Sequence, residues 1–528
     1  MSILQNSLVV APDRTQRLLG RREVALLASL AGVITTLLCA AGSWIPSLWG
    51  DEATSVISAQ RPLPSLFAML GHVDAVHGTY YLLLHFWVDL FGASPFSVRF
   101  PSAVAAGLAI AGVVVLANRI SGPRVAVFAG MVGLVLPRVN YMGEEARGYA
   151  LSAAVATWLG YLLVVQLQEK GRHRWLWLLY AIGVAFAAYV FLFSLLLLVA
   201  HAIVVLRSRT AGLRRDWLRA TILGLVLALP VIVYGVTESG QVDFLAHRND
   251  ASFVSDTVSP WFGTTQFAIA AWLLVLLGTV ALIVTYASRR LSLLGVPRSV
   301  WMRARRILGR LVTVDRGRET PSLLLFAGLW LLAPLVILLA VNVFHAIYSA
   351  RYLSFSAPAA ALLIGWVLAR VTRQWVAVVL TGILALTGLL SYVQNRTPYA
   401  KNNSDWAEVS AVMQEHAHPG DTVLFDEGSR PSRRLRLAMY TYPQGFAGLD
   451  DITLAAPAAQ TTNWYDATFP LEQVASELTT AHTVWLLEYK AQGAAPDTWD
   501  RPVLAAHGFV VRASYEQHSS VIYEYVRG

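Results

Sequence analysis

Cysteine is almost absent from this chain, which has one, Cys39, among its 528 residues. A single thiol excludes an intrachain disulfide framework, a CxxC redox motif and a thiolate metal site. Charge is also scarce, because Asp, Glu, Lys and Arg make up 14% of the residues, whereas soluble domains carry about a quarter. Nothing resembles a GxxxxGK[ST] or GxGxxG phosphate-binding motif, so ATP-driven transport and nicotinamide chemistry have no support.

Apolar residues are abundant instead. They make up 56% of the chain, and the mean hydropathy is +0.53. This surplus excludes one soluble globular domain and a disordered or fibrous chain, and it predicts a membrane protein. A spanning helix needs about 20 mainly apolar residues. Eleven runs are candidate crossings: 24–43, 99–118, 124–140, 148–167, 175–190, 192–206, 218–236, 262–287, 322–343, 353–370 and 375–393.

The basic residues predict the orientation of these crossings. The formal charge is +9, from 41 Lys and Arg against 32 Asp and Glu, and cytoplasmic loops collect Lys and Arg. A cytoplasmic N-terminus, 1–23, places most of the basic residues inside, including the basic loop 288–320. That loop is best explained by topology and anionic lipid, and no nucleic-acid partner is expected. The outer loops then hold Arg61, Arg99, Arg138, Arg147, Arg248 and Arg351.

The short apolar run 78–92 would reverse this order if it crossed the membrane. We therefore expect it to form a juxtamembrane helix within a first outer loop, 44–98. From about residue 395 the chain becomes polar and rich in turns. Strands are predicted at Thr422–Phe425, Thr483–Leu487, Phe509–Val511 and Val521–Tyr525, and a helix is predicted at Ser404–Ala417. An odd number of crossings places this segment outside.

The predicted fold class is thus an all-α polytopic membrane domain, 24–394, with about eleven transmembrane helices plus juxtamembrane helices. It is followed by an extracytoplasmic α/β domain, 395–528. Polar and ionisable groups near a membrane are costly and tend to be functional. Here they gather in three outer segments, which lie at 47–81, 138–149 and 342–352.

These segments supply carboxylates, imidazoles, guanidiniums and phenols. A carboxylate can act as a general base on a hydroxyl, and arginine stabilises a departing phosphate. Because nucleotide sugars are scarce outside the cytoplasm, a transferase there needs a donor that arrives in the membrane. A polyprenyl phosphate sugar meets this need.

At these residues the chain resembles the GT-C superfamily of integral membrane glycosyltransferases. The resemblance is to the branch of protein O-mannosyltransferases and aminoarabinose transferases, and most of all to actinobacterial polyprenyl-phosphate-dependent mannosyltransferases. It covers roughly residues 25–395. The matching motifs are Trp49-Gly50-Asp51-Glu52-Ala53, His77 to Tyr81, Arg99-Phe100-Pro101-Ser102, Glu145-Ala146-Arg147-Gly148-Tyr149 and Arg351-Tyr352.

The resemblance implies roles for three of these residues. Asp51 matches the base that takes the acceptor proton, with Glu52 beside it as a further catalytic acid. Glu145 matches a second acid in the next outer loop. Arg351 matches the residue that holds the lipid phosphate. Relatives often carry His-Pro-Pro where this chain has His77-Gly78-Thr79.

Two further groups complete the predicted site. The residues expected to bind the donor phosphate and lipid are Arg351, Tyr352, Arg99, Arg147, His345 and Tyr348. The residues expected to bind the acceptor or substrate are Asp74, His77, Tyr80, Tyr81, Glu144 and Tyr149. Structural alternatives stay open, because a loop acid can be merely solvated and an interfacial arginine can anchor a helix. No metal ligand is named, and a divalent cation held by carboxylates of two loops remains open.

The sequence therefore predicts a plasma-membrane enzyme that inverts the anomeric centre as it moves a sugar. Mannose is expected to pass from a polyprenyl phosphate carrier to a hydroxyl of a glycan, lipoglycan or protein acceptor. One alternative is transfer of another lipid-linked sugar such as arabinose. Another is a transporter or flippase of a lipid-linked glycan, and a third is a non-catalytic scaffold.

Overall fold

The computed structural model describes residues 20–208, 210, 212–241, 245, 251–287, 302–303, 306–308, 311–312, 322–490 and 499–528. Residues 1–19 of the predicted cytoplasmic segment, most of the basic loop 288–320 and Arg248 lie outside the described residues. The chain divides into two compact units. The helical unit comprises Met1–Ala40, Ser102–Glu144 and Gly148–Tyr392. The sheet-containing unit comprises Ala41–Pro101, Glu145–Arg147 and Val393–Gly528.

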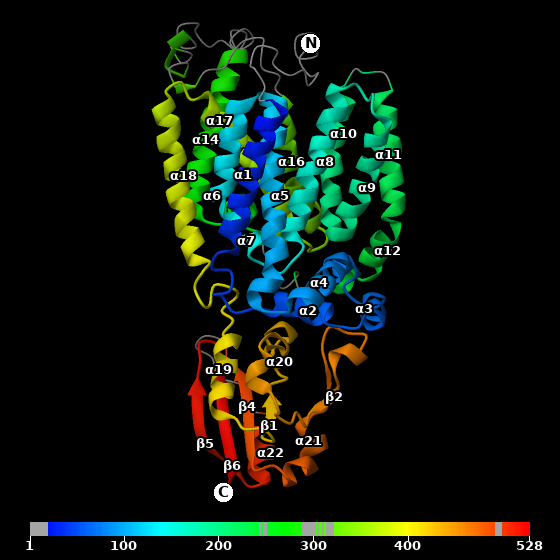
Figure 1. The fold of residues 1–528 in the computed structure, drawn as a ribbon, viewed down its shortest axis with the longest axis vertical. Helices are drawn as coiled ribbons and strands as arrows, with labels where there is room; N and C mark the ends of the chain where they lie inside the picture. Colours follow the sequence, from blue (N-terminus) through cyan, green and yellow to red (C-terminus); the bar gives the residue numbers. More distant parts are fainter. Residues whose placement is uncertain are drawn as a thin grey trace. The chain divides into compact units, whose positions relative to one another are not determined.

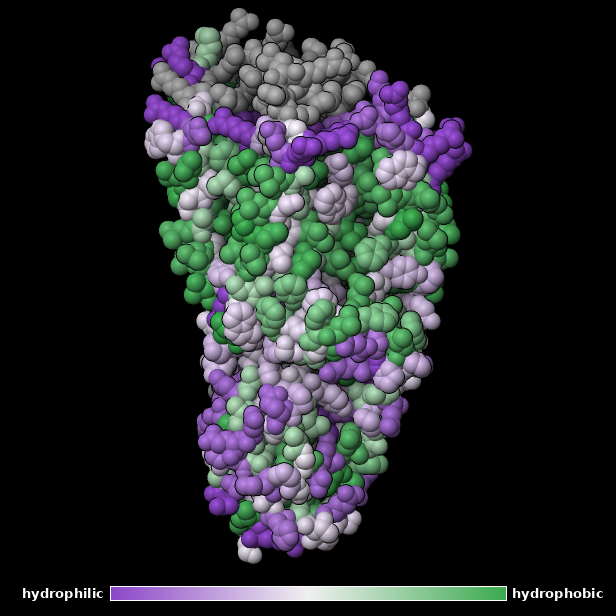
Figure 2. Space-filling model, in the orientation of Figure 1, coloured by the Kyte–Doolittle hydropathy of each residue, from purple (hydrophilic) through white to green (hydrophobic). Residues whose placement is uncertain are grey.

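Long helices build the helical unit, and apolar side chains dominate their visible face (Figures 1 and 2). The helices are α1 (Arg21–Ala40), α5 (Pro95–Ser121, which begins in the other unit), α6 (Pro123–Val135), α7 (Pro137–Gly143), α8 (Tyr149–Gln168), α9 (Arg174–Val190), η2 (Leu192–Leu196), α10 (Leu197–Leu206), α11 (Leu213–Leu227), α12 (Leu229–Thr237), α13 (Phe253–Thr257), α14 (Thr265–Ala287), α16 (Ser322–Asn342), η5 (Ala350–Ser356), α17 (Ala357–Arg370) and α18 (Gln374–Gln394).

Seven helical segments in the described part of the chain are long and apolar enough to cross a membrane. Two bent pairs, α6 with α7 and α11 with α12, raise that number to nine if each pair is one span. Helices α9 and α10 coincide with two further predicted runs but are shorter. A multi-pass membrane protein is therefore confirmed, while the number eleven stays a prediction.

Prolines explain both bent pairs. Pro137 and Pro230 each lie in the first turn of the second helix of a pair, and the axes bend by 58° and 56°. Proline lacks an N–H and its ring clashes with the preceding turn, so it favours the first turn of a helix and kinks or breaks a helix that it follows. The chain therefore turns at these points and starts a new helix.

Helix α17 forms the buried centre of the helical unit. Every residue from Ala357 to Ala369 is buried, and the helix packs against α6, α14 and α16. Gly365 permits the close approach to α6, because a Cβ at this position would lie 2.5 Å from the backbone of Ala129. A helix that is apolar on every face is expected to be buried on every face. Because η5 directly precedes α17, the packing of α17 holds the end of η5 in place.

Helices, 3-10 turns and two small sheets form the other unit. Its first part holds α2 (Gly50–Ala59), α3 (Leu63–Leu70), η1 (Ala75–His77) and α4 (Gly78–Phe91). Its later helices are α19 (Trp406–His416), η6 (Pro431–Arg433), α20 (Arg436–Thr441), η7 (Pro443–Phe446), η8 (Ala458–Gln460), α21 (Leu471–Val474), η9 (Ala475–Thr479) and α22 (Arg501–Ala506).

The main sheet has four strands in the order β1-β4-β6-β5. They are β1 (Thr422–Phe425), β4 (Thr483–Tyr489), β5 (Phe509–Glu516) and β6 (Ser520–Arg527). β1 and β4 are parallel and the other pairs are antiparallel. A second sheet pairs β2 (Leu454–Ala456) with β3 (Ala467–Thr468). The four predicted strands and the predicted helices at 404–417 and 78–92 are confirmed as elements, with small differences in their ends.

One boundary between the compact units lies between Tyr392 and Val393, close to the predicted start of the C-terminal domain at 395. The predicted first outer loop, 44–98, lies within residues 41–101, which cluster with the C-terminal segment. One apolar core joins them through Leu48, Tyr81, Trp406 and Trp485. The loop also contains two helices, α2 and α3, that the sequence patterns did not predict. Its polar residues are therefore held by a folded core.

Candidate active site

A buried ion pair anchors the first part of the sheet-containing unit. Arg99 donates to both carboxylate oxygens of Glu52, from Nε at 2.7 Å and from Nη2 at 2.5 Å, and neither side chain is exposed. The same guanidinium donates to the carbonyls of Ser43, Pro46 at 2.8 Å and Ser47 at 3.3 Å. A bidentate pair of this kind has a defined geometry, so it holds the Glu52 side chain in one orientation relative to the loop 43–47.

Glu52 also connects to the second predicted acidic segment. Its Oε1 accepts a hydrogen bond from the backbone N–H of Ala146 at 2.8 Å. The pair thus ties together α2, the start of α5 and residues 145–147, which are far apart in the sequence. Arg99, expected to bind the donor, and Glu52, expected to be catalytic, both contact protein groups here.

A second polar cluster surrounds Asp74. The phenol of Tyr81 donates to Asp74 Oδ2, and Trp464 Nε1 donates to the same oxygen at 3.2 Å. Burial, followed by the charge of Asp74, raises the pKa of Tyr81 well above its ordinary value. Tyr81 is therefore a neutral donor at physiological pH. Asp74 has a φ of +61°, in the left-handed region that a non-glycine residue rarely adopts.

Arg147 links this cluster to α2. Its Nη2 lies 3.0 Å from Nε2 of His77, and its Nη1 lies 3.3 Å from the hydroxyl of Tyr81 and 3.4 Å from the carbonyl of Asp51. Because a guanidinium can only donate, Nε2 of His77 must accept. Nε2 of His77 also lies 3.8 Å from Oδ1 of Asp74.

Asp51 differs from the acid beside it. It lies in the first turn of α2 and is partly exposed, whereas Glu52 is fully buried. Tyr465 lies near enough for the charges of Asp51 and Asp74 to contribute to its pKa, which burial first of all raises to about 12. A partly exposed carboxylate in this position can act as a general base on a bound hydroxyl.

The remaining predicted residues of the first two segments divide between the units. Tyr80 and Glu145 are buried in the sheet-containing unit. Glu144 and Tyr149 are buried in the helical unit, where the ring of Tyr149 packs edge-on against Phe191. The adjacent acids Glu144 and Glu145 therefore belong to different units.

The helical unit contains a second group of predicted residues around η5. Arg351 is partly exposed, and its guanidinium lies 5.7 Å from the ring centre of Tyr352. Tyr352 is buried and stacks on Phe193, with ring centres 5.1 Å apart. Nearby, Arg138 of α7 donates from Nε to Ser354 at 3.0 Å. One guanidinium, that of Arg351, therefore belongs to η5, and a second, that of Arg138, binds to it.

Tyr348 and His345 precede η5 in different environments. Tyr348 is buried, and its hydroxyl donates to the carbonyl of Ser255 at 2.6 Å. Burial, with the charge of Asp256, raises its pKa above the ordinary value. His345 is exposed. The hydrogen bond to Ser255 thus holds the Tyr348 side chain in place.

Three residues near these clusters had no predicted role. Trp464 and Tyr465 occur in the turn-rich stretch Asn463-Trp464-Tyr465-Asp466, where adjacent aromatic and polar residues were the available signal. Arg138 was noted as an outer-face arginine without a function. Their contacts join segments separated by up to 390 positions, which no local pattern reveals.

The described residues contain no group of three or more His, Cys, Asp or Glu side chains placed to hold a metal ion. Asp51 and Glu52 are adjacent in the sequence, but Asp51 is partly exposed, whereas Glu52 is buried and bound by Arg99. The carboxylates and guanidiniums of these clusters are groups that can accept a proton and bind an anion.

Residues 79–234 match the family model described as Dolichyl-phosphate-mannose-protein mannosyltransferase. This match spans less than half of the chain. A comparison with curated proteins gives no match.

Solved structures give a match along nearly the whole chain. ArnT from Cupriavidus metallidurans bound to undecaprenyl phosphate has a TM-score of 0.56 at 15% identity, covering 96% of this chain and 98% of that one. Apo ArnT from the same organism gives a TM-score of 0.51 at 15% identity, covering 95% and 98%. AglB from Archaeoglobus fulgidus has a TM-score of 0.44 at 11% identity, covering 88% and 69%. The chain therefore has the GT-C-like fold of ArnT, as the sequence resemblance implied.

Proposed function

We propose that this chain transfers a sugar from a polyprenyl phosphate carrier to an acceptor hydroxyl at the extracytoplasmic face of the plasma membrane. Mannose is the expected sugar, and inversion at the anomeric carbon is the expected stereochemistry. The observation that carries the proposal is the contrast between two neighbouring acids. Glu52 is fully engaged by Arg99, while Asp51 is partly exposed at the start of α2.

Asp51 is the general base in this proposal. Its carboxylate takes the proton of the acceptor hydroxyl as the hydroxyl oxygen forms a bond to the anomeric carbon. The bond from that carbon to the phosphate oxygen breaks, and its electrons leave with the polyprenyl phosphate. One such displacement inverts the anomeric centre and needs no covalent intermediate.

The cluster around Asp74 orients the acceptor side. Tyr81, Trp464 and Arg147 hold Asp74 and His77 through hydrogen bonds. Arg147 also donates to the carbonyl of Asp51, so a displacement of the cluster would reach the base. Groups held in this way limit the motion of a bound hydroxyl, which increases the rate of its attack.

Arg351 binds the donor phosphate, and Arg138, which donates to Ser354 of the same 3-10 segment, adds a second positive charge. A guanidinium matches two phosphate oxygens and stabilises the charge that develops as the carrier leaves. The stacked rings of Tyr352 and Phe193 offer an apolar surface that suits the first units of a lipid chain.

Two comparisons support this proposal. The family model that matches residues 79–234 names a dolichyl phosphate mannose donor. The ArnT structure that matches 96% of this chain is bound to undecaprenyl phosphate. Dolichyl phosphate and undecaprenyl phosphate are both long isoprenoid chains that end in a phosphate.

The test is a transfer assay with purified chain in proteoliposomes. Polyprenyl phosphate mannose and polyprenyl phosphate arabinose are supplied separately with a cell-envelope glycan acceptor. We expect one donor to give a glycosylated product and an equal amount of free polyprenyl phosphate. Arg351→Ala should raise the KM for that donor at least tenfold, whereas Arg370→Ala, at the opposite end of α17, should not.

Each other outcome selects a different function. Transfer from the arabinose donor alone would keep the reaction and replace the sugar. Movement of an intact lipid-linked glycan across the bilayer without product formation would identify a flippase. Absence of both activities would contradict the proposal.

A further inference from the structure

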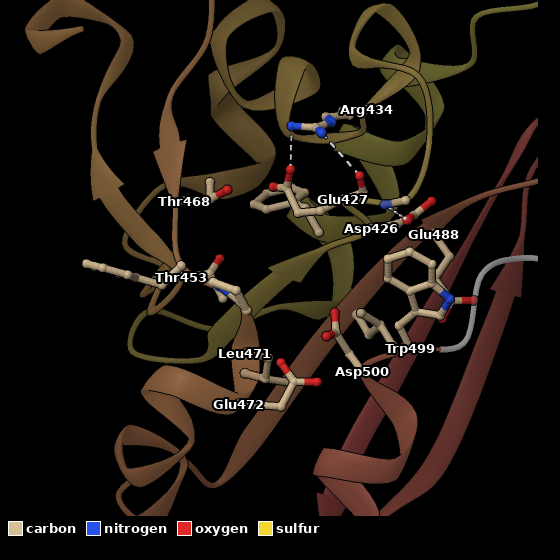
Figure 3. Close-up of a pocket in the computed structure, with 15 residues that line it drawn as sticks. Asp426, Glu427, Arg434, Thr453, Thr468, Leu471, Glu472, Glu488, Trp499 and Asp500 are labelled. Atoms are coloured by element: carbon tan, nitrogen blue, oxygen red, sulfur yellow. Dashed lines mark hydrogen bonds and ion pairs between the residues drawn. The ribbon is translucent and has the colours of Figure 1, made fainter.

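A hollow of about 280 Å³ lies at the carboxyl ends of the parallel strands β1 and β4 (Figure 3). Asp426 and Glu427 directly follow β1, and Glu488 lies near the end of β4. In open α/β sheets, ligands bind beyond the carboxyl ends of the parallel strands. The volume is near the lower limit for small-ligand pockets, about 300 Å³, which suits one or two sugar rings.

Two acids at this hollow are already neutralised by arginines. Glu427 pairs with Arg434 at 2.5 Å and with Arg436 at 3.3 Å, and Glu488 pairs with Arg501 at 2.8 Å. These pairs make the walls rigid. They leave carboxylate oxygens next to guanidinium N–H groups, so acceptors and donors alternate along the lining.

Two further carboxylates point into the space. Figure 3 shows the side chains of Glu472, from α21, and Asp500, just before α22, directed into the same hollow. Within the described residues no three such side chains converge closely enough for a metal ion. Separated acceptors of this kind match a ligand with several hydroxyl donors better than they match a single cation.

Aromatic side chains form an apolar part of the lining. Trp499 is 73% exposed and Phe469 is 44% exposed, and both border the hollow. Exposed apolar patches that are rimmed by polar residues are typical of ligand-binding grooves. The apolar face of a sugar ring packs on such a ring while its hydroxyls reach the neighbouring carboxylates.

We propose that this hollow is a carbohydrate-binding subsite that holds one or two neutral sugar units of a glycan. It rests on the proposed function in one respect, because the glycan it holds would be the acceptor chain. Carboxylates and Trp499 would fix a sugar unit of the acceptor other than the one that is modified.

The test measures binding to the full chain in detergent, without any donor. Saturation-transfer NMR and calorimetry are run with a mannotriose and an arabinotriose as neutral probes and with tetralysine as a cationic probe. We expect at least one trisaccharide to bind saturably. Trp499→Ala and the double variant Glu472→Gln/Asp500→Asn should each weaken that binding at least tenfold.

Matched variants separate this inference from its alternatives. Trp175→Ala, an exposed tryptophan of the helical unit, and Glu516→Gln should bind as the wild type does, and all variants should keep the wild-type thermal midpoint. Absence of saturable trisaccharide binding, or wild-type affinity in both pocket variants, would overturn the proposal. Tighter binding of tetralysine that displaces the sugar would assign the hollow to a basic peptide instead.

Asp51→Asn distinguishes this failure from a failure of the proposed function. That variant should lose transfer and keep trisaccharide binding. If it transferred sugar at the wild-type rate, the proposed mechanism would be wrong, while the subsite would still be judged by the binding data alone.

Discussion

Adjacent residues in this chain have different surroundings, and Asp51 and Glu52 are the clearest case. Successive residues on a helix point about 100° apart, so one acid faces the core and the next does not. Which acid faces inward depends on α2 starting at Gly50. A Cβ at Gly50 would overlap the carbonyl oxygen of Ser432, so that glycine fixes where the helix docks.

Replacing Glu52 with Gln should destabilise the protein strongly. The substitution leaves the buried guanidinium of Arg99 without its charged partner, and breaking a buried pair costs about 3–5 kcal/mol. We expect a marked fall in the thermal midpoint in detergent.

Glu516→Gln is the matched surface control. Glu516 pairs with Lys490 at 2.9 Å, but its side chain is 77% exposed, so its loss should cost less than about 1 kcal/mol. Equal midpoints for the two variants would show that the Glu52–Arg99 pair does not stabilise the fold.

The sequence predicts acids and arginines for the proposed site, but it does not predict their partners. Arg99 is predicted to bind the donor because it is a basic residue on the outer side. Its burial and its contacts with three backbone carbonyls depend on loops that local patterns do not place. Trp464 reaches Asp74 across 390 positions for the same reason.

At the scale of elements, the contact between α17 and α6 depends on Gly365. Gly365→Ala should lower stability, because the added Cβ would meet the Ala129 backbone at 2.5 Å and the helices would have to separate. Overpacking of this kind costs about 1–3 kcal/mol. The thermal midpoint in detergent measures the effect.

Gly382→Ala in α18 is the control, since no atom lies within 4 Å of a Cβ at that position. Alanine also favours a helix over glycine by about 1 kcal/mol. The control should therefore be neutral or stabilising, and a similar loss in both variants would contradict the role of close packing.

Asp405 connects α19 to the turn between β5 and β6. Its carboxylate accepts from Ser519 N–H at 2.6 Å and from the hydroxyl of Ser520 at 2.8 Å. Burial raises the pKa of Asp405 above its ordinary value. The folded state therefore binds the proton more tightly than the unfolded state, so this group's contribution to stability is lost as pH rises through the raised pKa.

Asp405→Asn should remove that pH dependence. Relative to the wild type, the variant should gain stability between pH 4 and the raised pKa, and the difference should level off above it. Thermal midpoints measured from pH 4 upward test this. A difference that does not change with pH would show that Asp405 titrates normally.

The elements themselves were largely predictable. Long apolar runs predicted the helices, and short β-branched runs such as Thr422–Phe425 predicted the strands. Helices α2 and α3 were missed because α2 contains few large apolar residues, and its burial comes from small side chains packed against distant segments. Asp405 was predicted near a helix cap, and it does precede α19, but its side chain bonds Ser519 and Ser520 instead.

At the scale of the whole molecule, segments far apart in the chain form one body. Residues 41–101 and 393–528 share a core, which composition could not reveal because the two segments differ in hydropathy. The distribution of Lys and Arg predicts which loops lie on the cytoplasmic side of the membrane. This orientation can be tested directly.

A cysteine-labelling experiment tests that topology. In a Cys39→Ser background, Arg172→Cys lies between α8 and α9, on the predicted cytoplasmic side, and Glu477→Cys lies in the C-terminal segment. Both positions are exposed. A membrane-impermeant maleimide added to intact cells should label Glu477→Cys and should label Arg172→Cys only after lysis. The reverse pattern would invert the orientation.

The most direct test of the central claim is the transfer rate of Asp51→Asn. Asparagine keeps the size of the side chain and cannot take the acceptor proton, so the account predicts a loss of at least a hundredfold in kcat, in line with general-base catalysis. Asp89→Asn, a control acid with a 62% exposed side chain, should transfer sugar normally. A folded Asp51→Asn protein that transfers sugar at the wild-type rate would contradict the account.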